Sequence, residues 1–333
     1  MRILVTGTAG FIGFHLARRL LAEGHVVTGY DGVTKYYDPA LKLARLALLA
    51  REPDFIEVRG MLEDAVALEE AVAASQAEVV VHLAAQPGVR YSLEHPQSYI
   101  QSNVVGTANL LEALRRHPPR HFIFASTSSV YGGNSKLPFA EADRADAPLS
   151  LYAATKKAGE AMVHSYAHLF GIASTCLRFF TVYGPWGRPD MAAIKFARAI
   201  MEGKPIDVYG HGAMRRDFTY VDDLVTVIGR LMDLPPERGK PVAHDSPSAV
   251  APFRSVNVAG GQPTELMDFI RTLERAAGRA AQLNLLPMQP GDVVETASDT
   301  TLLRSLIGDV PETSVEDGVA GFFMWFKTYY GYA

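Results

Sequence analysis

Cysteine is almost absent from this chain, because Cys176 is the only one among its 333 residues. No disulfide can therefore form within the chain, and the apolar run 173–177 around this cysteine favours a buried thiol over a catalytic nucleophile. The sequence also lacks an uncharged apolar run long enough to cross a bilayer. Its first residues lack the apolar stretch and cleavage site of a signal peptide. We therefore expect a cytoplasmic protein without a membrane partner.

A basic excess is missing as well, since 32 lysines and arginines stand against 36 aspartates and glutamates. The net charge of −4 argues against a nucleic-acid-binding protein, which usually carries many more basic than acidic residues. A small anionic ligand is not excluded, because local clusters of charge decide its binding. We predict no metal site. Hydrophobic residues make up 48% of the chain and charged residues 20%, the balance of a globular protein with a sizeable core.

Short apolar runs alternate with helix-period segments through the first half of the chain. The expected strands cover residues 2–6, 26–30, 55–58, 79–83, 121–125 and 173–177. The expected helices cover residues 11–22, 39–51, 62–74, 99–116 and 151–170. Strands that alternate with helices form crossover units, so the sequence predicts an α/β fold with a doubly wound parallel sheet of the Rossmann type.

The pattern loosens after residue 178, where proline and glycine become frequent. Further helices are expected at 191–202, 221–232, 266–276 and 315–330. We predict a first domain made of residues 1–180, with segments near 216–260 that return to its sheet. Residues 181–215 and 261–333 are expected to form a second, smaller and mostly α domain.

Glycines mark the turn between the first expected strand and the first expected helix, at Gly7, Gly10 and Gly13. They allow a sharp turn and a close approach of the backbone to a pyrophosphate, which the N-terminus of the helix also attracts. Asp31 follows at the end of the second strand, placed to accept hydrogen bonds from adenosine ribose hydroxyls. Because a carboxylate there repels a 2′-phosphate, we predict that the first domain binds NAD rather than NADP.

Tyr152 and Lys156 stand four residues apart at the start of an expected helix, so they share one face of it. A free tyrosine, with a pKa of about 10, is a poor base at neutral pH. A cation at about 4 Å would stabilise the phenolate by roughly 4 kcal/mol at an effective dielectric of about 20. Thr127 lies just beyond the fifth expected strand, where open α/β sheets bind ligands, and is placed to relay a proton to Tyr152. These three residues form the predicted catalytic set.

The glycine turn, this catalytic set and segment 216–223 resemble those of the extended short-chain dehydrogenase/reductases that act on nucleotide sugars. Longer segments resemble the UDP-glucuronate 4-epimerase subfamily, at residues 36–39, 82–92, 178–185, 188–191 and 289–292. The resemblance runs over nearly the whole chain. It implies NAD-dependent C4 epimerisation of UDP-glucuronate to UDP-galacturonate through a 4-keto intermediate, in polysaccharide biosynthesis. It also implies a homodimer and a second domain that binds the nucleotide sugar.

The resemblance implies roles for individual residues. Thr127, Tyr152 and Lys156 match the catalytic residues. The residues that match the NAD site are Gly7, Gly10, Phe11, Ile12, Gly13, Asp31, Leu62, Leu83, Ala84, Ala85, Asn103, Tyr152, Lys156 and Phe180. The residues that match the substrate site are Pro87, Arg90, Ser128, Thr181, Arg188, Lys195, Arg216 and Asp292. Among these, the positions of Ser128, Thr181 and Arg188 match contacts to the glucuronate carboxylate, which an arginine grips with two parallel hydrogen bonds.

Other functions use the same scaffold. UDP-glucose 4-epimerases usually have asparagine where this chain has Thr181, and UDP-glucuronate decarboxylases usually have glutamate at the position of Ser129. A dinucleotide-binding regulatory protein would tend to lose Tyr152 or Lys156, and both are present. The chain departs from the family pattern at Met61, where an aspartate usually faces the adenine amino group.

Overall fold

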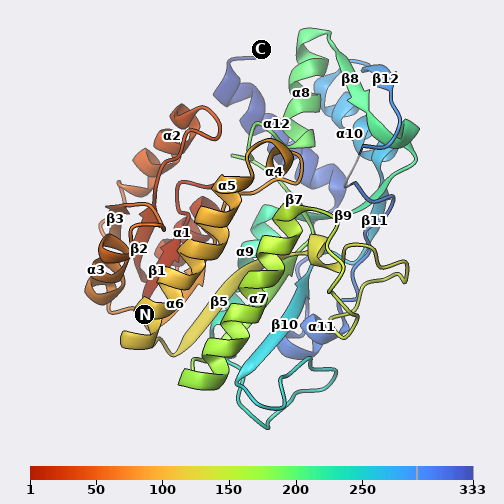
Figure 1. Cartoon of the computed structure of the whole chain (residues 1–333). Coiled ribbons are helices and arrows are strands. Elements are labelled where there is room, and N and C mark those ends of the chain that lie inside the picture. The colour runs from red at the N-terminus through yellow and green to blue at the C-terminus, as the bar shows by residue number, and fades with distance from the viewer. Residues whose placement is uncertain (290–291, 333) are drawn as a thin grey trace.

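The computed structural model describes residues 1–289 and 292–332, so Pro290 and Gly291 of segment 289–292, and Ala333, lie outside the described residues. Within them, seven parallel strands form a central sheet (Figure 1). Their order across the sheet is β10 (Phe253–Val258), β6 (Ser174–Phe179), β5 (His121–Thr127), β4 (Val79–His82), β1 (Arg2–Thr6), β2 (Val26–Asp31) and β3 (Phe55–Arg59). Strands β4, β5 and β6 are buried along their whole length, as their continuous apolar runs predicted.

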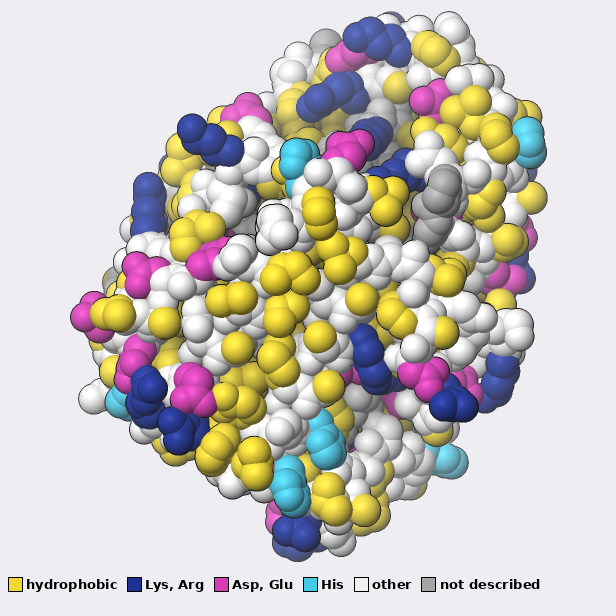
Figure 2. Space-filling model, viewed as in Figure 1, with side chains coloured by type: hydrophobic (Ala, Val, Ile, Leu, Met, Phe, Trp, Pro, Cys, Tyr) yellow, Lys and Arg dark blue, Asp and Glu magenta, His cyan; other side chains and the backbone are white. Residues whose placement is uncertain are grey.

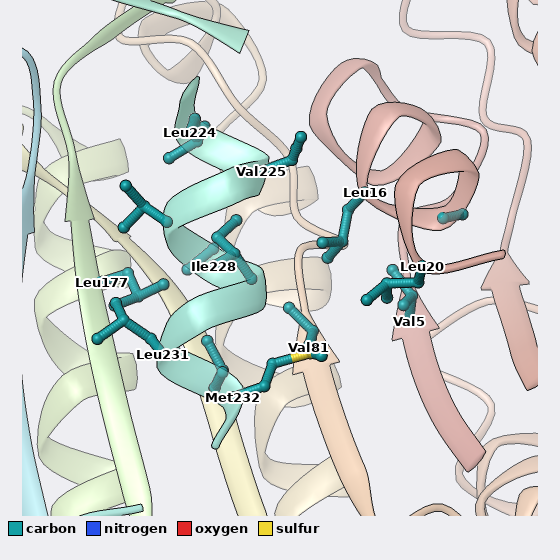
Figure 3. Close-up of a cluster of buried hydrophobic side chains, with 14 of the residues drawn as sticks. Val5, Leu16, Leu20, Val81, Leu177, Leu224, Val225, Ile228, Leu231 and Met232 are labelled. Atoms are coloured by element: carbon teal, nitrogen blue, oxygen red, sulfur yellow. The ribbon is translucent and has the colours of Figure 1, made fainter. Parts of the chain in front are cut away.

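Helices cover both faces of this sheet, so it is doubly wound. One face carries α3 (Ala65–Ser75), α6 (Gly106–Arg116) and α7 (Leu151–Phe170), and the other carries α1 (Phe11–Ala22), α2 (Pro39–Leu49), α9 (Val221–Met232) and α11 (Thr301–Ile307). Each face of the sheet has its own cluster of buried apolar side chains, the first on the side of α3, α6 and α7 and the second on the side of α1, α2, α9 and α11. Successive residues of β1 point to opposite faces, because Leu4 packs in the first cluster whereas Ile3 and Val5 pack in the second. Figure 3 shows the second cluster, where Ile228 of α9 lies near Leu177 of β6.

The chain changes direction across the sheet between β1 and β4. Strands β2 and β3 lie on one side of β1, whereas β4, β5, β6 and β10 lie on the other. Open α/β sheets bind ligands beyond the carboxyl ends of their strands at such a point. Here the glycine turn follows β1 and residues 83–85 follow β4, and both segments line the same crevice.

The second half contains helices α8 (Ala192–Glu202), α10 (Leu266–Ala277) and α12 (Val315–Tyr330) around an apolar cluster of its own. Short strands that the sequence analysis did not predict accompany these helices. One small sheet has the order β11 (Pro263–Glu265), β9 (Arg215–Tyr220) and β7 (Thr181–Tyr183), and another pairs β12 (Gln282–Leu285) with β8 (Pro205–Val208), which leads into η3 (Tyr209–Gly212). Of the segments near 216–260, β10 joins the central sheet and β9 does not. The division of the chain at residue 180 stays a prediction.

Two expected helices differ in the structure. The helix expected from residue 62 begins at Ala65, because the Asp64 carboxylate accepts a hydrogen bond from the Ala67 N–H and caps it. The helix expected at 99–116 follows the short α4 (Tyr91–Glu94) and divides into α5 (Pro96–Tyr99), a π-helical segment η1 (Ile100–Val105) and α6. None of the described helices is long and apolar enough to span a membrane.

Candidate active site

The turn after β1 brings backbone atoms too close together for side chains. Gly7 has a φ of +83°, and a Cβ built on it would lie 2.8 Å from the Ala84 backbone nitrogen. A Cβ on Gly13 would collide with the carbonyl oxygen of Gly7. Only glycine fits at these two positions, which leaves an open cradle at the N-terminus of α1. The N–H groups of that terminus attract phosphate, so the cradle fits a pyrophosphate.

Asp31 ends β2 beside this cradle. One of its carboxylate oxygens accepts a hydrogen bond from the Ala9 N–H at 2.9 Å, and the other accepts from the Val33 N–H at 2.7 Å. The two bonds fix the carboxylate at the rim of the crevice. Each oxygen retains a lone pair that a ribose hydroxyl can use.

One pocket extends from the glycine turn to α7, and we call it the catalytic pocket. The predicted site residues that line it are Gly7, Gly10, Phe11, Ile12, Gly13, Asp31, Leu62, Leu83, Ala84, Ala85, Pro87, Tyr152, Lys156 and Arg188. Asn103 and Phe180 are not among its lining residues. Asn103 is buried on η1 and hydrogen-bonds the N–H and the carbonyl of Gln86, which fixes the loop after β4. Phe180 packs in a small apolar cluster with Tyr131 and Phe139.

Tyr152 lies in the first turn of α7, and Thr127 ends β5 beside it. The Thr127 side chain is close enough to Tyr152 to lower its pKa. Thr127 also caps η2 (Ser128–Tyr131), because its hydroxyl accepts from the Ser129 N–H at 3.2 Å. Burial raises the pKa of Tyr152, and Arg188 and Thr127 act against this rise. Tyr152 is therefore a protonated phenol at neutral pH, held in a position to exchange its proton.

Lys156 is not among the groups that oppose the effect of burial on the pKa of Tyr152. The pKa of Tyr152 is raised rather than lowered, and the cation that opposes the rise is Arg188. The Lys156 ammonium instead donates to the carbonyl oxygen of Ala125 at 2.8 Å and lies 5.1 Å from the centre of the Phe124 ring. Burial lowers the pKa of Lys156 itself to about 8. Its membership of the catalytic set stays a prediction.

A buried ion pair holds the carboxyl end of β5 in place. Glu160 of α7 accepts a hydrogen bond from the Ser126 hydroxyl at 2.6 Å and forms two more with Arg178 of β6, at 2.9 and 3.0 Å. The side chains of Glu160 and Arg178 are only 4% and 5% exposed. Removal of one partner would leave an uncompensated buried charge, which typically costs about 3–5 kcal/mol. The pair therefore fixes β5 relative to α7, and with them Thr127 relative to Tyr152.

A second pocket lies between α8 and the small sheet, and we call it the outer pocket. The predicted substrate residues that line it are Arg90, Thr181, Lys195, Arg216 and Asp292. Arg90 forms a 2.9 Å ion pair with Asp292. Arg216 donates to backbone carbonyls of residues 215, 293 and 294, and the Lys195 side chain is exposed. Because Arg90 is paired with Asp292, Lys195 and Arg216 are the cations of this pocket that suit an anionic ligand such as a diphosphate. Ser128 lines neither pocket.

The two pockets meet at an ion pair. Arg188 lines the catalytic pocket and Asp190 lines the outer pocket. Arg188 donates from Nε to Oδ1 of Asp190 at 3.0 Å and from Nη2 to Oδ2 at 2.9 Å. Burial would lower the pKa of Arg188 and raise that of Asp190, and their mutual attraction more than reverses both shifts. Both groups therefore stay charged.

Two cations on α2 belong to the site and were missed by the sequence analysis. Lys42 lines the catalytic pocket on the side of Asp31 and donates twice to residue 34, at 2.8 Å each. Arg45 is fully buried and donates to the backbone carbonyls of residues 9, 186 and 187. It thereby ties the glycine turn to the segment that precedes Arg188. The sequence contains only a weak indication that these two cations are buried, namely that they lie on the same helix face as Leu46 and Leu49.

Known proteins resemble this chain over its whole length. The sequence profile of the NAD dependent epimerase/dehydratase family matches residues 3–243. The chain is 57% identical to a probable UDP-glucuronate 4-epimerase of Rhizobium meliloti (strain 1021), over 99% of this chain and 98% of that protein. It is 44% identical to UDP-glucuronate 4-epimerase 1 of Arabidopsis thaliana, over 99% of this chain and 77% of that protein.

A solved structure is similar as well. The crystal structure of UDP-glucuronic acid 4-epimerase from Bacillus cereus, in complex with UDP-glucuronic acid and NAD, matches with a TM-score of 0.89. The two sequences are 34% identical over 99% of this chain and 100% of that chain. The expected fold class and the resemblance read from the sequence are thereby confirmed. This chain belongs to the NAD dependent epimerase/dehydratase family.

Proposed function

We propose that this chain is a UDP-glucuronate 4-epimerase that interconverts UDP-glucuronate and UDP-galacturonate with tightly bound NAD. Relatives with this activity cover nearly the whole chain. Within the site, the observation that carries the proposal is Arg188, which lines the catalytic pocket together with Tyr152. A sugar whose 4-hydroxyl reaches Tyr152 has its C6 group nearby, so a guanidinium there favours a hexuronate over a neutral hexose.

The catalytic pocket fits NAD. The glycine cradle would hold the pyrophosphate, Asp31 the adenosine ribose, and Tyr152 and Lys156 line the far end of the pocket. Bound NAD supplies a reversible hydride acceptor for C4 of the sugar. Because the hydride returns to the sugar in each cycle, the reaction consumes no cofactor.

The purified protein should therefore contain NAD and convert UDP-glucuronate to UDP-galacturonate without added cofactor. Acid release followed by chromatography measures the cofactor, and separation of the nucleotide sugars measures the product. NADP in the released fraction, or a demand for stoichiometric NADH, would contradict the assignment.

Proton transfer falls to Tyr152 and Thr127. The Tyr152 phenol first releases its own proton to solvent, and the phenolate then takes up the 4-hydroxyl proton as C4 is oxidised and returns it after the 4-keto sugar has turned over. Thr127, which lies close to Tyr152, would share that proton with the substrate hydroxyl. We assign the hexuronate carboxylate to Ser128, Thr181 and Arg188. The remaining predicted substrate residues, Pro87, Arg90, Lys195, Arg216 and Asp292, would hold the rest of the nucleotide sugar.

Two other reactions on this scaffold are less well supported. Ser129 lies next to the proton-transfer site, because its hydroxyl accepts from Thr127 at 3.2 Å. An acid at this position could act on a 4-keto sugar, as decarboxylation requires, and serine cannot supply one. A UDP-glucose 4-epimerase has no use for the Arg188 guanidinium, and relative rates on UDP-glucuronate and UDP-glucose separate that alternative from the proposal.

We further propose that two copies of the chain associate through α6 and α7. Ala154, Ala158, Ala161, Ser165 and Leu169 follow one stripe of α7, and none of them is buried. Figure 2 shows hydrophobic side chains gathered in a band over α6 and α7. Small side chains allow a second pair of helices to approach closely, which supports a homodimer with a four-helix interface.

Ala161→Glu should convert the dimer to a monomer, because it places a charge within that apolar stripe. The substitution is on the exposed surface of the single chain and should change monomer stability by no more than about 0.5 kcal/mol. Light scattering coupled to size exclusion gives the mass. Met324→Glu on α12, where the methionine is 71% exposed, is the control and should stay dimeric. A monomeric parent protein, or a dimeric Ala161→Glu variant, would contradict the proposed interface.

A further inference from the structure

The Arg188 guanidinium has two edges that can each grip a carboxylate. The side edge consists of Nε and one hydrogen of Nη2, and Asp190 occupies it with hydrogen bonds of 3.0 and 2.9 Å. The end edge consists of Nη1 and the second hydrogen of Nη2. No hydrogen bond to this edge comes from residues 1–289 or 292–332. One of the two Arg188 edges is thus engaged by Asp190, and Arg188 lines the catalytic pocket.

Two further contacts hold the ion pair in place. The Tyr36 hydroxyl donates to Oδ2 of Asp190 at 3.1 Å, and the Tyr36 ring packs on Tyr91 with centroids 4.7 Å apart. Behind Arg188, the fully buried Arg45 binds the carbonyls of Trp186 and Gly187. Trp186 has a φ of +58°, a left-handed conformation that is strained for a residue with a side chain. Both the backbone and the side chain of Arg188 are therefore fixed by the protein itself, through Asp190, Arg45 and the pocket-lining Tyr36.

We propose that Asp190, supported by Tyr36, is a positioning residue that selects the acid sugar by holding the side edge of Arg188 and leaving its end edge to the hexuronate carboxylate. This inference rests on the proposed function. An arginine side chain that is free to rotate loses conformational entropy when it binds a ligand, and this loss weakens binding. An arginine already held by a neighbouring carboxylate of the protein has lost that entropy before the ligand arrives, so it binds the ligand more tightly. Asp190 lines the outer pocket and not the catalytic pocket, so its own charge lies outside the pocket that Tyr152 lines.

The test measures dissociation constants of UDP-glucuronate and UDP-glucose on the NAD-loaded protein by calorimetry. Asp190→Asn should weaken UDP-glucuronate binding about tenfold, and Tyr36→Phe should weaken it by a smaller factor in the same direction. UDP-glucose, which offers only a hydroxyl at C6, should bind each variant within about twofold of the parent. A general structural role would weaken both ligands alike, so the ratio of the two constants is the decisive readout.

A double variant shows whether Asp190 acts through Arg188. If it does, Asp190→Asn should cause no additional loss of UDP-glucuronate affinity when Arg188 is already alanine. Losses that multiply in the double variant would overturn the proposal. So would an unchanged ratio in Asp190→Asn, and so would tighter binding of UDP-glucuronate, since Asp190 would then compete with the substrate.

The failure of this inference is distinguishable from failure of the proposed function. A parent protein that epimerises UDP-glucose and not UDP-glucuronate would contradict the function itself. A parent protein active on UDP-glucuronate, with an Asp190→Asn variant of unchanged ligand ratio, would contradict only the role of Asp190. The same calorimetric titrations and product assays supply both results.

Discussion

Replacement of Tyr152 by phenylalanine should lower the turnover of UDP-glucuronate by roughly 10² or more, the scale expected for loss of a general acid–base group. The substitution removes only the phenol hydroxyl, which lies close to Thr127. The ring remains, together with its packing on Tyr99 at a centroid distance of 6.2 Å. The loss should therefore appear in kcat, while the NAD content of the purified protein stays close to one per chain. Steady-state rates and acid-released cofactor measure the two quantities.

Tyr166→Phe is a matched control on the same helix. It removes a phenol hydroxyl that bonds Glu112 on the surface, away from the catalytic pocket. Such a substitution usually changes the free energy by no more than about 0.5 kcal/mol, so turnover should stay within about twofold of the parent. Near-normal turnover in Tyr152→Phe would contradict the role of the phenol. A parallel loss of NAD would show that the variant damages the cofactor site instead.

The central sheet was predictable because its strands leave a strong local signal. Val79–His82 and Ser174–Phe179 are buried on both faces, and strands of that kind are rich in apolar residues, although Ser174–Phe179 also holds the paired Arg178. The short strands of the second half carry no such signal. All four residues of β12, Gln282–Leu285, are exposed, and the strand exists because β8 pairs with it. Its formation depends on a partner 77 residues away, which local periodicity cannot indicate.

The predictable part of the site is likewise the part that local geometry determines. Helical spacing puts Tyr152 and Lys156 on one face, and a strand that runs into a glycine turn places Gly7 at the crevice. The partners of these groups come from distant parts of the chain. Lys156 bonds a carbonyl 31 residues away, and Arg90 pairs with Asp292 across 202 residues. Such contacts depend on tertiary packing, which explains why the sequence could not show that burial outweighs the opposing effect of a cation on the pKa of Tyr152.

Arg188→Ala should reduce kcat/KM for UDP-glucuronate by roughly 10–150-fold, since a hydrogen bond to a charged group contributes about 1.5–3 kcal/mol. The C6 hydroxyl of UDP-glucose cannot form that charge-assisted bond, so activity on UDP-glucose should change much less. The substitution also leaves the Asp190 carboxylate with Tyr36 as its remaining partner in the ion-pair cluster. The double variant Arg188→Ala/Asp190→Asn removes this unpaired charge and is the matched control. Equal losses on both sugars in both variants would instead indicate a structural or phosphate-binding arginine.

The same variant should also release more decarboxylated product. Oxidation at C4 turns the hexuronate into a β-keto acid, which loses carbon dioxide fastest when the bond from C5 to the carboxylate is perpendicular to the carbonyl plane. An epimerase must let the sugar turn over while it keeps that bond out of this alignment, and a fixed guanidinium can hold the carboxylate in either orientation. A change of about 1.4 kcal/mol between the competing barriers shifts the product ratio tenfold. Mass spectrometry should therefore detect a larger fraction of 4-keto-pentose from Arg188→Ala, with reduced cofactor visible by absorbance. A variant that is merely slower, with an unchanged decarboxylated fraction, would show that Arg188 selects the acid sugar without protecting its oxidised form.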